Sequence, residues 1–124
     1  MPALGFKKHL APLVESRVKR QTIRQVWRNP IKAGDTLYLY TGLRTKQCRK
    51  LGESICTSVR EIQIQPPGGL IVGEGIYLYG KGKLSLSESL ELAAKDGFKN
   101  IHDFISFFRD QYGLPFEGVL IEWE

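Results

Sequence analysis

The sequence predicts an α+β fold in which residues 1–124 form a single domain, a small β-barrel of about five or six strands decorated by two or three helices. Short segments with alternating or β-branched apolar residues make up much of the chain, and turns rich in glycine and proline separate them. The helical patterns fall near the start and before the last strand, so they do not alternate with the strands. A hydrophobic content of 42% in 124 residues is enough for one core.

The first half of the chain is expected to carry one helix and three strands. The elements are a helix at 10–16, strands at 22–27, 36–41 and 54–65, and a basic connector at 42–51. Pro12 is tolerated in the first turn of the helix, and Asn29-Pro30 ends the first strand. The strand at 36–41 alternates most clearly, and a Pro-Pro-Gly-Gly turn at 66–69 ends the third strand.

The second half is expected to begin with a hairpin and to end with a strand. The elements are strands at 76–79 and 83–86, helices at 87–96 and 101–112, and a closing strand at 118–123. Gly80-Lys81-Gly82 is the hairpin turn. Ser87 is the expected N-cap of the first helix and Gly97 its stop, and Asn100 is the expected N-cap of the second.

The formal net charge of +5 hides an uneven distribution along the chain. Residues 1–62 contain 13 basic and four acidic residues, whereas residues 63–124 contain five basic and nine acidic residues. A basic surface favours a polyanionic partner, and RNA or another single-stranded nucleic acid is the first candidate. Lysines that serve only solubility give a similar pattern, so the charge leaves both interpretations open.

Several classes of protein lack their signals in this sequence. No apolar run approaches the roughly 18 residues of a membrane helix, and the first residues do not have the order of a signal peptide. We therefore expect a soluble, cytoplasmic protein with no membrane partner. Cys48 and Cys56 are expected to be reduced thiols, and no metal site is expected because four ligands at zinc spacing are missing. The glycine pattern fits neither the dinucleotide fingerprint nor the P-loop, and no cofactor is expected.

A candidate site lies in residues 18–24. On an extended strand Thr22 and Arg24 point to the same face, and Lys19 lies at the entry of the strand. A lysine polarises an oxygen or acts as a base when desolvated, a threonine donates a hydrogen bond or attacks, and an arginine binds phosphate through two hydrogen bonds. The three groups suit an anionic or carbonyl-bearing ligand. Solvated basic residues on an edge strand are the alternative interpretation.

Three motifs occur in order along the chain. Residues 19–24 read KRQTIR, residues 30–37 read PIKAGDTL, and residues 96–98 read DGF before a helix. Over roughly residues 6–123 the chain resembles the ASCH domain, a family of the PUA-like barrels. The resemblance implies a β-barrel with a cleft, in a superfamily associated with RNA binding and modified nucleosides.

The resemblance also implies two activities. Small bacterial members of the family act as N4-acetylcytidine amidohydrolases with a Lys, a Thr and a Glu, and another bacterial member is reported as a ribonuclease. On the matching positions the catalytic residues are Lys19, Thr22 and Asp96. Asp96 departs from the family's Glu by one methylene group. In this mechanism Thr22 attacks the acetyl carbonyl, Lys19 activates Thr22 and stabilises the oxyanion, and Asp96 passes a proton to the leaving amine.

Three functional hypotheses follow. The first is a nucleic-acid-binding ASCH domain with a cleft at Lys19, Thr22, Arg24 and Asp96, with or without ribonuclease activity. The residues expected to bind nucleic acid are Lys19, Arg20, Arg24, Arg44, Lys46, Arg49 and Lys50. The second is an N4-acetylcytidine amidohydrolase that acts on a modified nucleoside. The third is a protein-interaction module with an acidic partner. Catalysis and oligomeric state stay open.

Two pairs of tyrosines are further candidates. Tyr38 and Tyr40 share one strand face, as do Tyr77 and Tyr79, and leucines occupy the opposite face of each strand. Exposed tyrosine rings are stacking platforms for bases, and packing with a solvated hydroxyl is the alternative.

Overall fold

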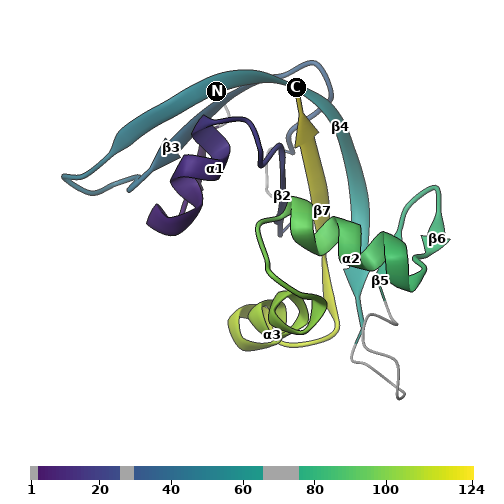
Figure 1. The fold of residues 1–124 in the computed structure, drawn as a ribbon. Helices are drawn as coiled ribbons and strands as arrows, with labels where there is room; N and C mark the ends of the chain where they lie inside the picture. Colours follow the sequence, from purple (N-terminus) through teal and green to yellow (C-terminus); the bar gives the residue numbers. More distant parts are fainter. Residues whose placement is uncertain (1–2, 26–29, 66–75) are drawn as a thin grey trace.

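The computed structural model describes residues 3–25, 30–65 and 76–124, and within these ranges it is an α+β fold of seven strands and three α-helices (Figure 1). The strands are β1 (Ala3–Phe6), β2 (Gln21–Arg24), β3 (Thr36–Thr41), β4 (Arg49–Ile64), β5 (Ile76–Leu78), β6 (Gly82–Lys83) and β7 (Phe116–Trp123). The helices are a 3-10 turn, η1 (Lys8–Leu10), and α1 (Ala11–Glu15), α2 (Leu86–Lys95) and α3 (Ile101–Tyr112).

The 16-residue strand β4 holds the sheet together. Its first part pairs with β3, and its second part pairs with β7 on one side and with β5 on the other. All pairings are antiparallel except that of β1 with β3. Register shifts between Leu39 and Tyr40 and between Cys56 and Ser58 mark irregularities of the kind that bend a strand, and β4 curves over the length of the molecule in Figure 1.

The sheet is mixed and is not closed into a barrel by the pairings of the described residues. The strand order is β1-β3-β4-β5-β6, and β7 pairs with both β4 and β2. The seven strands of the described ranges exceed the expected five or six because β1 was not expected. Four residues are too few for a periodic signal, and the partner of β1 lies more than 30 residues later in the chain.

Two apolar cores lie on the two parts of β4. One lies between the sheet and the helices α2 and α3, and its largest buried side chains are Phe104, Phe108, Ile64, Ile76 and Leu120. The other lies between β1, β3, the C-terminal end of β7 and α1, and includes Leu4, Phe6, Val14, Leu37 and Trp123. The strand β2 therefore runs along β7 close to the boundary of the two cores, where its polar side chains reach both the helices and the N-terminal segment.

Most expected elements are confirmed, with shifted ends. The strand at 36–41 and the helix at 101–112 are found with those bounds, and the alternation of tyrosine and leucine in β3 is confirmed. The connector at 42–51 is wrong at its end, because β4 begins at Arg49 and pairs with β3 from there. The expected turn at 66–69 and residues 26–29, with the expected end of the strand at 22–27, lie outside the described ranges.

The N-cap of α2 is Ser85 rather than Ser87. Ser85 accepts a hydrogen bond from the backbone N–H of Glu88, and the Glu88 carboxylate accepts one from the backbone N–H of Ser85. This reciprocal capping box satisfies two backbone donors, so the helix starts two residues earlier than expected. The strand β6 is correspondingly shorter than the expected strand at 83–86. In the described ranges no helix is long and apolar enough to cross a membrane.

Candidate functional site

Lys19 and Asp96 form a buried ion pair. The Lys19 Nζ donates to the Asp96 Oδ1 at 3.1 Å and to the Asp96 backbone oxygen at 2.8 Å. The side chains are only 3% and 9% exposed. Removing two charges from water is costly unless the charges are paired and hydrogen-bonded, and here each charge faces the other. The structure therefore brings Lys19 and Asp96, two of the four residues of the expected cleft, into direct contact.

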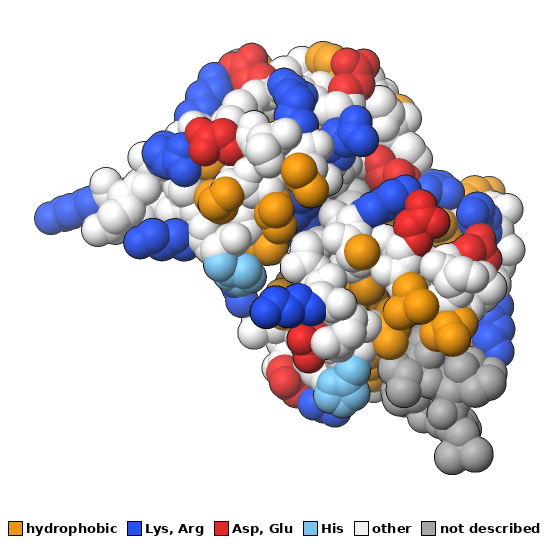
Figure 2. All heavy atoms as spheres, in the orientation of Figure 1, with side chains coloured by type: hydrophobic (Ala, Val, Ile, Leu, Met, Phe, Trp, Pro, Cys, Tyr) orange, Lys and Arg blue, Asp and Glu red, His pale blue; other side chains and the backbone are white. Residues whose placement is uncertain are grey.

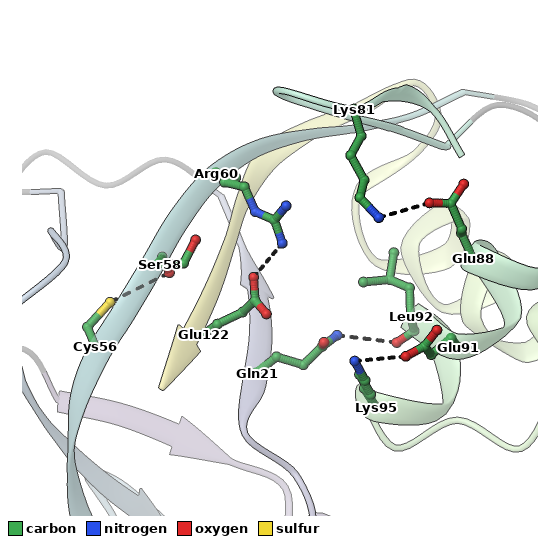
Figure 3. A network of polar contacts seen from close by, with 10 residues as sticks. All are labelled: Gln21, Cys56, Ser58, Arg60, Lys81, Glu88, Glu91, Leu92, Lys95 and Glu122. Carbon is green, nitrogen blue, oxygen red and sulfur yellow. Dashed lines mark hydrogen bonds and ion pairs between the residues drawn. The ribbon is translucent and has the colours of Figure 1, made fainter. Parts of the chain in front are cut away.

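The end of α2 positions Asp96. Asp96 is the C-cap residue, and Gly97 follows with a φ of +96°, a left-handed conformation that glycine adopts without strain. A Cβ at position 97 would lie 2.7 Å from the Leu10 Cδ2, so glycine also allows the end of η1 to approach. Figure 3 shows a second tie between β2 and this helix, because the Gln21 Nε2 donates to the Leu92 backbone oxygen at 3.2 Å.

The side chains of Thr22 and Arg24 form the other half of the cluster. The Arg24 Nε donates to the Thr22 Oγ1 at 3.1 Å, and the Arg24 Nη2 donates to the Gly5 backbone oxygen at 2.6 Å. Both residues lie on β2 and point to one face, as the alternation of an extended strand requires. Thr22 is buried and Arg24 is half-buried, so the alternative interpretation of solvated side chains does not hold, although β2 pairs with β7 alone among the described strands.

Phe6 joins the two halves of the cluster. The Lys19 Nζ lies 5.8 Å from the centroid of the Phe6 ring, and the Arg24 guanidinium carbon lies 5.3 Å from it. These distances allow both cations to interact with one aromatic face or edge. Sequence reasoning did not identify Phe6, because its place beside β2 depends on the unexpected strand β1. Gln21 was also missed. It follows Lys19 by two residues, and on an extended segment such residues point to the same side, so the sequence could have indicated it.

The protonation equilibria of the cluster are displaced by burial. Desolvation lowers the pKa of Lys19, and the nearby Asp96 partly offsets this effect. Desolvation raises the pKa of Asp96, while Lys19, Gln21 and Arg24 act in the opposite direction. Burial also lowers the pKa of Arg24, with Tyr112 and Asp96 opposing it. Displaced pKa values of a paired base and acid are typical of functional sites and of structural ion pairs alike.

A cationic groove lies next to this cluster, between the η1 and α1 segment and the hairpin of β3 and β4. Its volume is about 870 Å³, and it is lined by Phe6, Lys7, Lys8, Ala11, Pro12, Thr41, Gly42, Thr45, Gln47 and Arg49. We call it the Phe6 groove. Three of its lining residues are basic and none is acidic.

The remaining residues expected to bind nucleic acid lie outside the buried cluster. Arg20, Arg44 and Lys46 are exposed, and the last two lie in the turn between β3 and β4, which projects from the molecule in Figures 1 and 2. Arg49 is paired with Glu15 at 2.7 Å, and Lys50 is paired with Glu53 and lies over the Tyr38 ring. The expected cation set is thus divided between a buried pair, a groove and a hairpin.

Other candidate ligands do not gather. Cys48 is exposed, Cys56 is buried, and both are free thiols. In the part of the chain that the structure describes, no three His, Cys, Asp or Glu side chains are placed to hold a metal ion. The chemistry available at the site is therefore that of an ammonium, a carboxyl, a hydroxyl and a guanidinium around one aromatic ring.

A comparison of the chain with protein-family models, curated proteins and solved structures found no match.

Proposed function

We propose that the chain is an ASCH-type, PUA-like domain that binds single-stranded RNA in the Phe6 groove. The observation that carries the proposal is the shared position of Phe6. Its side chain lines the cationic groove and also lies within 6 Å of the Lys19 and Arg24 cations. Phosphates held in the groove therefore bring the attached nucleoside up to the cluster of Lys19, Thr22 and Arg24.

The charges of the groove suit a phosphate backbone. Lys7, Lys8 and Arg49 line it without an acidic lining residue among the described ones, and of these cations Arg49 is paired with Glu15. Arg44 and Lys46 extend the positive charge along the hairpin. Nucleic-acid affinity rests largely on such contacts because each neutralised phosphate releases counterions. The groove's volume falls within the ~300–1,000 Å³ of typical ligand sites, which suits an unpaired nucleotide better than a duplex.

Salt-dependent binding of a short single-stranded RNA tests this function. With about four phosphates neutralised, the logarithm of the association constant falls against the logarithm of salt concentration with a slope near −3. Fluorescence anisotropy of a labelled ~10-nucleotide RNA measures this slope, with Lys8→Gln as the groove variant and Lys95→Gln as the control on α2. No binding at low salt, a slope near zero, or salt-dependent binding only to an acidic protein contradicts the proposal.

A second candidate function is hydrolysis of the amide of N4-acetylcytidine to cytidine and acetate. The observation that favours it is the desolvated Lys19 with its lowered pKa, held by Asp96 next to the strand that carries Thr22. In this reaction the neutral Lys19 amine takes the Thr22 hydroxyl proton as the Thr22 Oγ1 attacks the acetyl carbon, and the resulting ammonium stabilises the oxyanion. The C–N bond then breaks, and the proton passes from Lys19 through Asp96 to the leaving amine of cytidine. Water then hydrolyses the acetyl-Thr22 ester, which releases acetate and returns the hydroxyl proton to Thr22.

The change in ultraviolet absorbance on conversion of N4-acetylcytidine to cytidine measures this activity. Thr22→Val removes the hydroxyl at nearly constant volume and is expected to abolish turnover, whereas Thr22→Ser retains a nucleophile and part of the rate. Wild-type protein without turnover, or a Thr22→Val variant with full turnover, contradicts the hydrolase proposal. Either result leaves the RNA-binding measurement as an independent test.

A further inference from the structure

The exposed face of the strands β7, β4 and β5 carries a second group of side chains. These strands pair along the second part of β4, whereas the Phe6 groove lies at the start of β4. In the register Glu117, Gln63 and Tyr77 lie opposite one another across the three strands. Tyr79 extends β5 by donating its backbone N–H to the Glu61 backbone oxygen at 2.9 Å. Glu61 and Tyr79 therefore form the next row, on the same face of the sheet.

Both tyrosines of this face are exposed. The side chains of Tyr77 and Tyr79 are 39% and 73% exposed, while Leu78 between them is buried. Residues two apart on a strand lie roughly 7 Å apart on the same face, so the two rings border the same stretch of surface. The two rings lie on the side of the chain away from the buried Leu78, so packing in the core does not account for them.

Carboxylates border the same space. A cavity of about 440 Å³ is lined by Glu61, Tyr77, Tyr79 and Glu117, among others, and its described lining includes no Lys, Arg or His. Cross-strand neighbours on one face have Cβ atoms roughly 5 Å apart, and diagonal neighbours roughly 7–8 Å apart, so Glu61 lies beside Tyr79 and diagonal to Tyr77 on this face. The Gln63 Nε2 donates to the Glu117 Oε1 at 2.9 Å and fixes the second carboxylate.

Two lysines lie near this face, and neither lines the cavity. Lys81 lies between the glycines of the β5–β6 turn, but its Nζ donates to the Glu88 Oε2 at 2.9 Å on α2, as Figure 3 shows. Lys83 is opposite Tyr77 in the register of β6, on the side of that ring away from Gln63, and does not line the cavity. The carboxylate side of the tyrosine pair is therefore the side to which a cationic ligand is attracted.

We propose that this face is a binding site for an alkylated ammonium group, with Tyr77 and Tyr79 as the two walls and Glu61 as the counter-charge. A trimethylammonium group is the best fit, because it is weakly hydrated, offers methyl groups to an aromatic ring and keeps its charge at every pH. A phosphate or a nucleic-acid backbone is repelled by the two carboxylates. The site is independent of the RNA-binding function proposed above.

A matched pair of probes separates charge from shape. Choline and its neutral carbon isostere, 3,3-dimethyl-1-butanol, have the same shape, and titration of the 15N-labelled protein by NMR at millimolar concentrations measures both. We expect choline to shift the amide signals of residues near 61, 77 and 79, and the neutral isostere to leave them unchanged. Equal shifts with both probes, or no shift with choline, overturn the proposal.

Variants of the walls and of the counter-charge test the assignment. Tyr79→Leu keeps an apolar side chain but removes the aromatic ring, and it is expected to weaken choline binding about fivefold. Glu61→Gln removes the counter-charge and is expected to weaken binding by a similar factor. Tyr79→Phe is expected to retain most of the affinity, and Tyr112→Leu, which removes an exposed tyrosine outside this face, serves as the control. Tyr79→Leu or Glu61→Gln with wild-type affinity and a wild-type NMR spectrum elsewhere overturns the proposal.

The two natural sources of such a group are distinguished by a second titration. Acetyl-trimethyllysine amide presents the same ammonium group on a peptide, and choline presents it on a free small molecule. Competition of the peptide for the choline-dependent signals assigns a protein ligand, and binding of choline without such competition assigns a small molecule. Both results support the ammonium site and differ in the occupant.

Discussion

The Lys19 Nζ makes both of its described hydrogen bonds to one residue, Asp96, which lies 77 positions later in the chain. One bond goes to the carboxylate and the other to the backbone oxygen at the end of α2. The lysine thus neutralises a buried charge and also satisfies a helix C-terminus, where a cation is favoured. The pair joins the entry of β2 to the helical layer.

Removing one partner of this pair is expected to cost more than removing both. Lys19→Met or Asp96→Leu leaves a buried group uncompensated and is expected to lower the free energy of unfolding by about 3–5 kcal/mol. The double variant fills the same space with apolar atoms and is expected to lose less than the sum of the single losses. Urea denaturation followed by circular dichroism measures all three, and additive losses contradict this expectation.

The same series predicts an unusual pH dependence. In Lys19→Met the carboxyl of Asp96 is buried without its main partner, so its pKa in the folded state lies above the unfolded value, as desolvation already dictates. The folded state then binds more protons than the unfolded state between these two values, and stability falls as pH rises through that window. We expect the deficit of Lys19→Met to be smaller in mild acid than at pH 7. A deficit independent of pH contradicts this prediction.

The sequence predicted this site better than it predicted the sheet around it. The direction of Thr22 and Arg24 follows from strand alternation, and the hydrogen bond between them confirms it. The partner Asp96 was suggested by a motif rather than by any local physical signal. Phe6 escaped prediction because a four-residue strand paired in parallel has no periodicity to detect, and its place is set by long-range pairing.

Gly97 is expected to be the most demanding glycine at a helix end. Gly97→Ala places a Cβ 2.7 Å from the Leu10 Cδ2 and forces a left-handed conformation, with an expected loss of about 2–3 kcal/mol. Gly80→Ala is the control, because it has a similar φ of +90° but no atom within 4 Å of the added carbon. The difference between the two losses measures the contact of η1 with the end of α2. Equal losses from thermal or urea unfolding contradict a role for this close approach.

The capping box of α2 is expected to contribute to acid sensitivity. The Ser85 backbone N–H, the Lys81 ammonium and the Ser85 hydroxyl hold the pKa of Glu88 at about 2, below its usual 4.5. Because the folded-state pKa is depressed, this contribution is present above pH 4.5 and is lost as the pH falls towards 2. Glu88→Gln keeps the shape of the side chain without the charge, so the stability difference between wild type and variant is expected to shrink over this window. A constant difference contradicts the assignment.

The ends of the elements show where local rules were insufficient. Ser85 and Ser87 are both N-cap residues by type, and only Ser85 has a glutamate three residues later that completes the capping box. The basic connector was extended too far because Arg49 and Lys50 are exposed and charged. Their place on β4 depends on pairing with Thr41 and Tyr40 across the hairpin, which no local composition reveals.

The hairpin between β3 and β4 is expected to affect RNA binding without affecting folding. Arg44 and Lys46 are exposed, and neither has an acidic partner among the residues that the structure describes. Arg44→Gln with Lys46→Gln removes both charges and keeps unbranched polar side chains. The left-handed backbone at Arg44, with a φ of +66°, is occupied by a non-glycine residue in both proteins. Stability is therefore expected to change by less than about 0.5 kcal/mol.

If each of these two side chains neutralises one phosphate, the salt slope of single-stranded RNA binding becomes less steep by up to ~1.4 in the double variant, or ~0.7 per charge. The matched control is Lys81→Gln, since Lys81 is paired with Glu88 on the α2 side of the molecule. Anisotropy titrations at several salt concentrations measure both slopes, and circular dichroism confirms that the variants are folded. An unchanged slope in the hairpin variant places the bound strand within the Phe6 groove alone, where Lys7, Lys8 and Arg49 supply the cations.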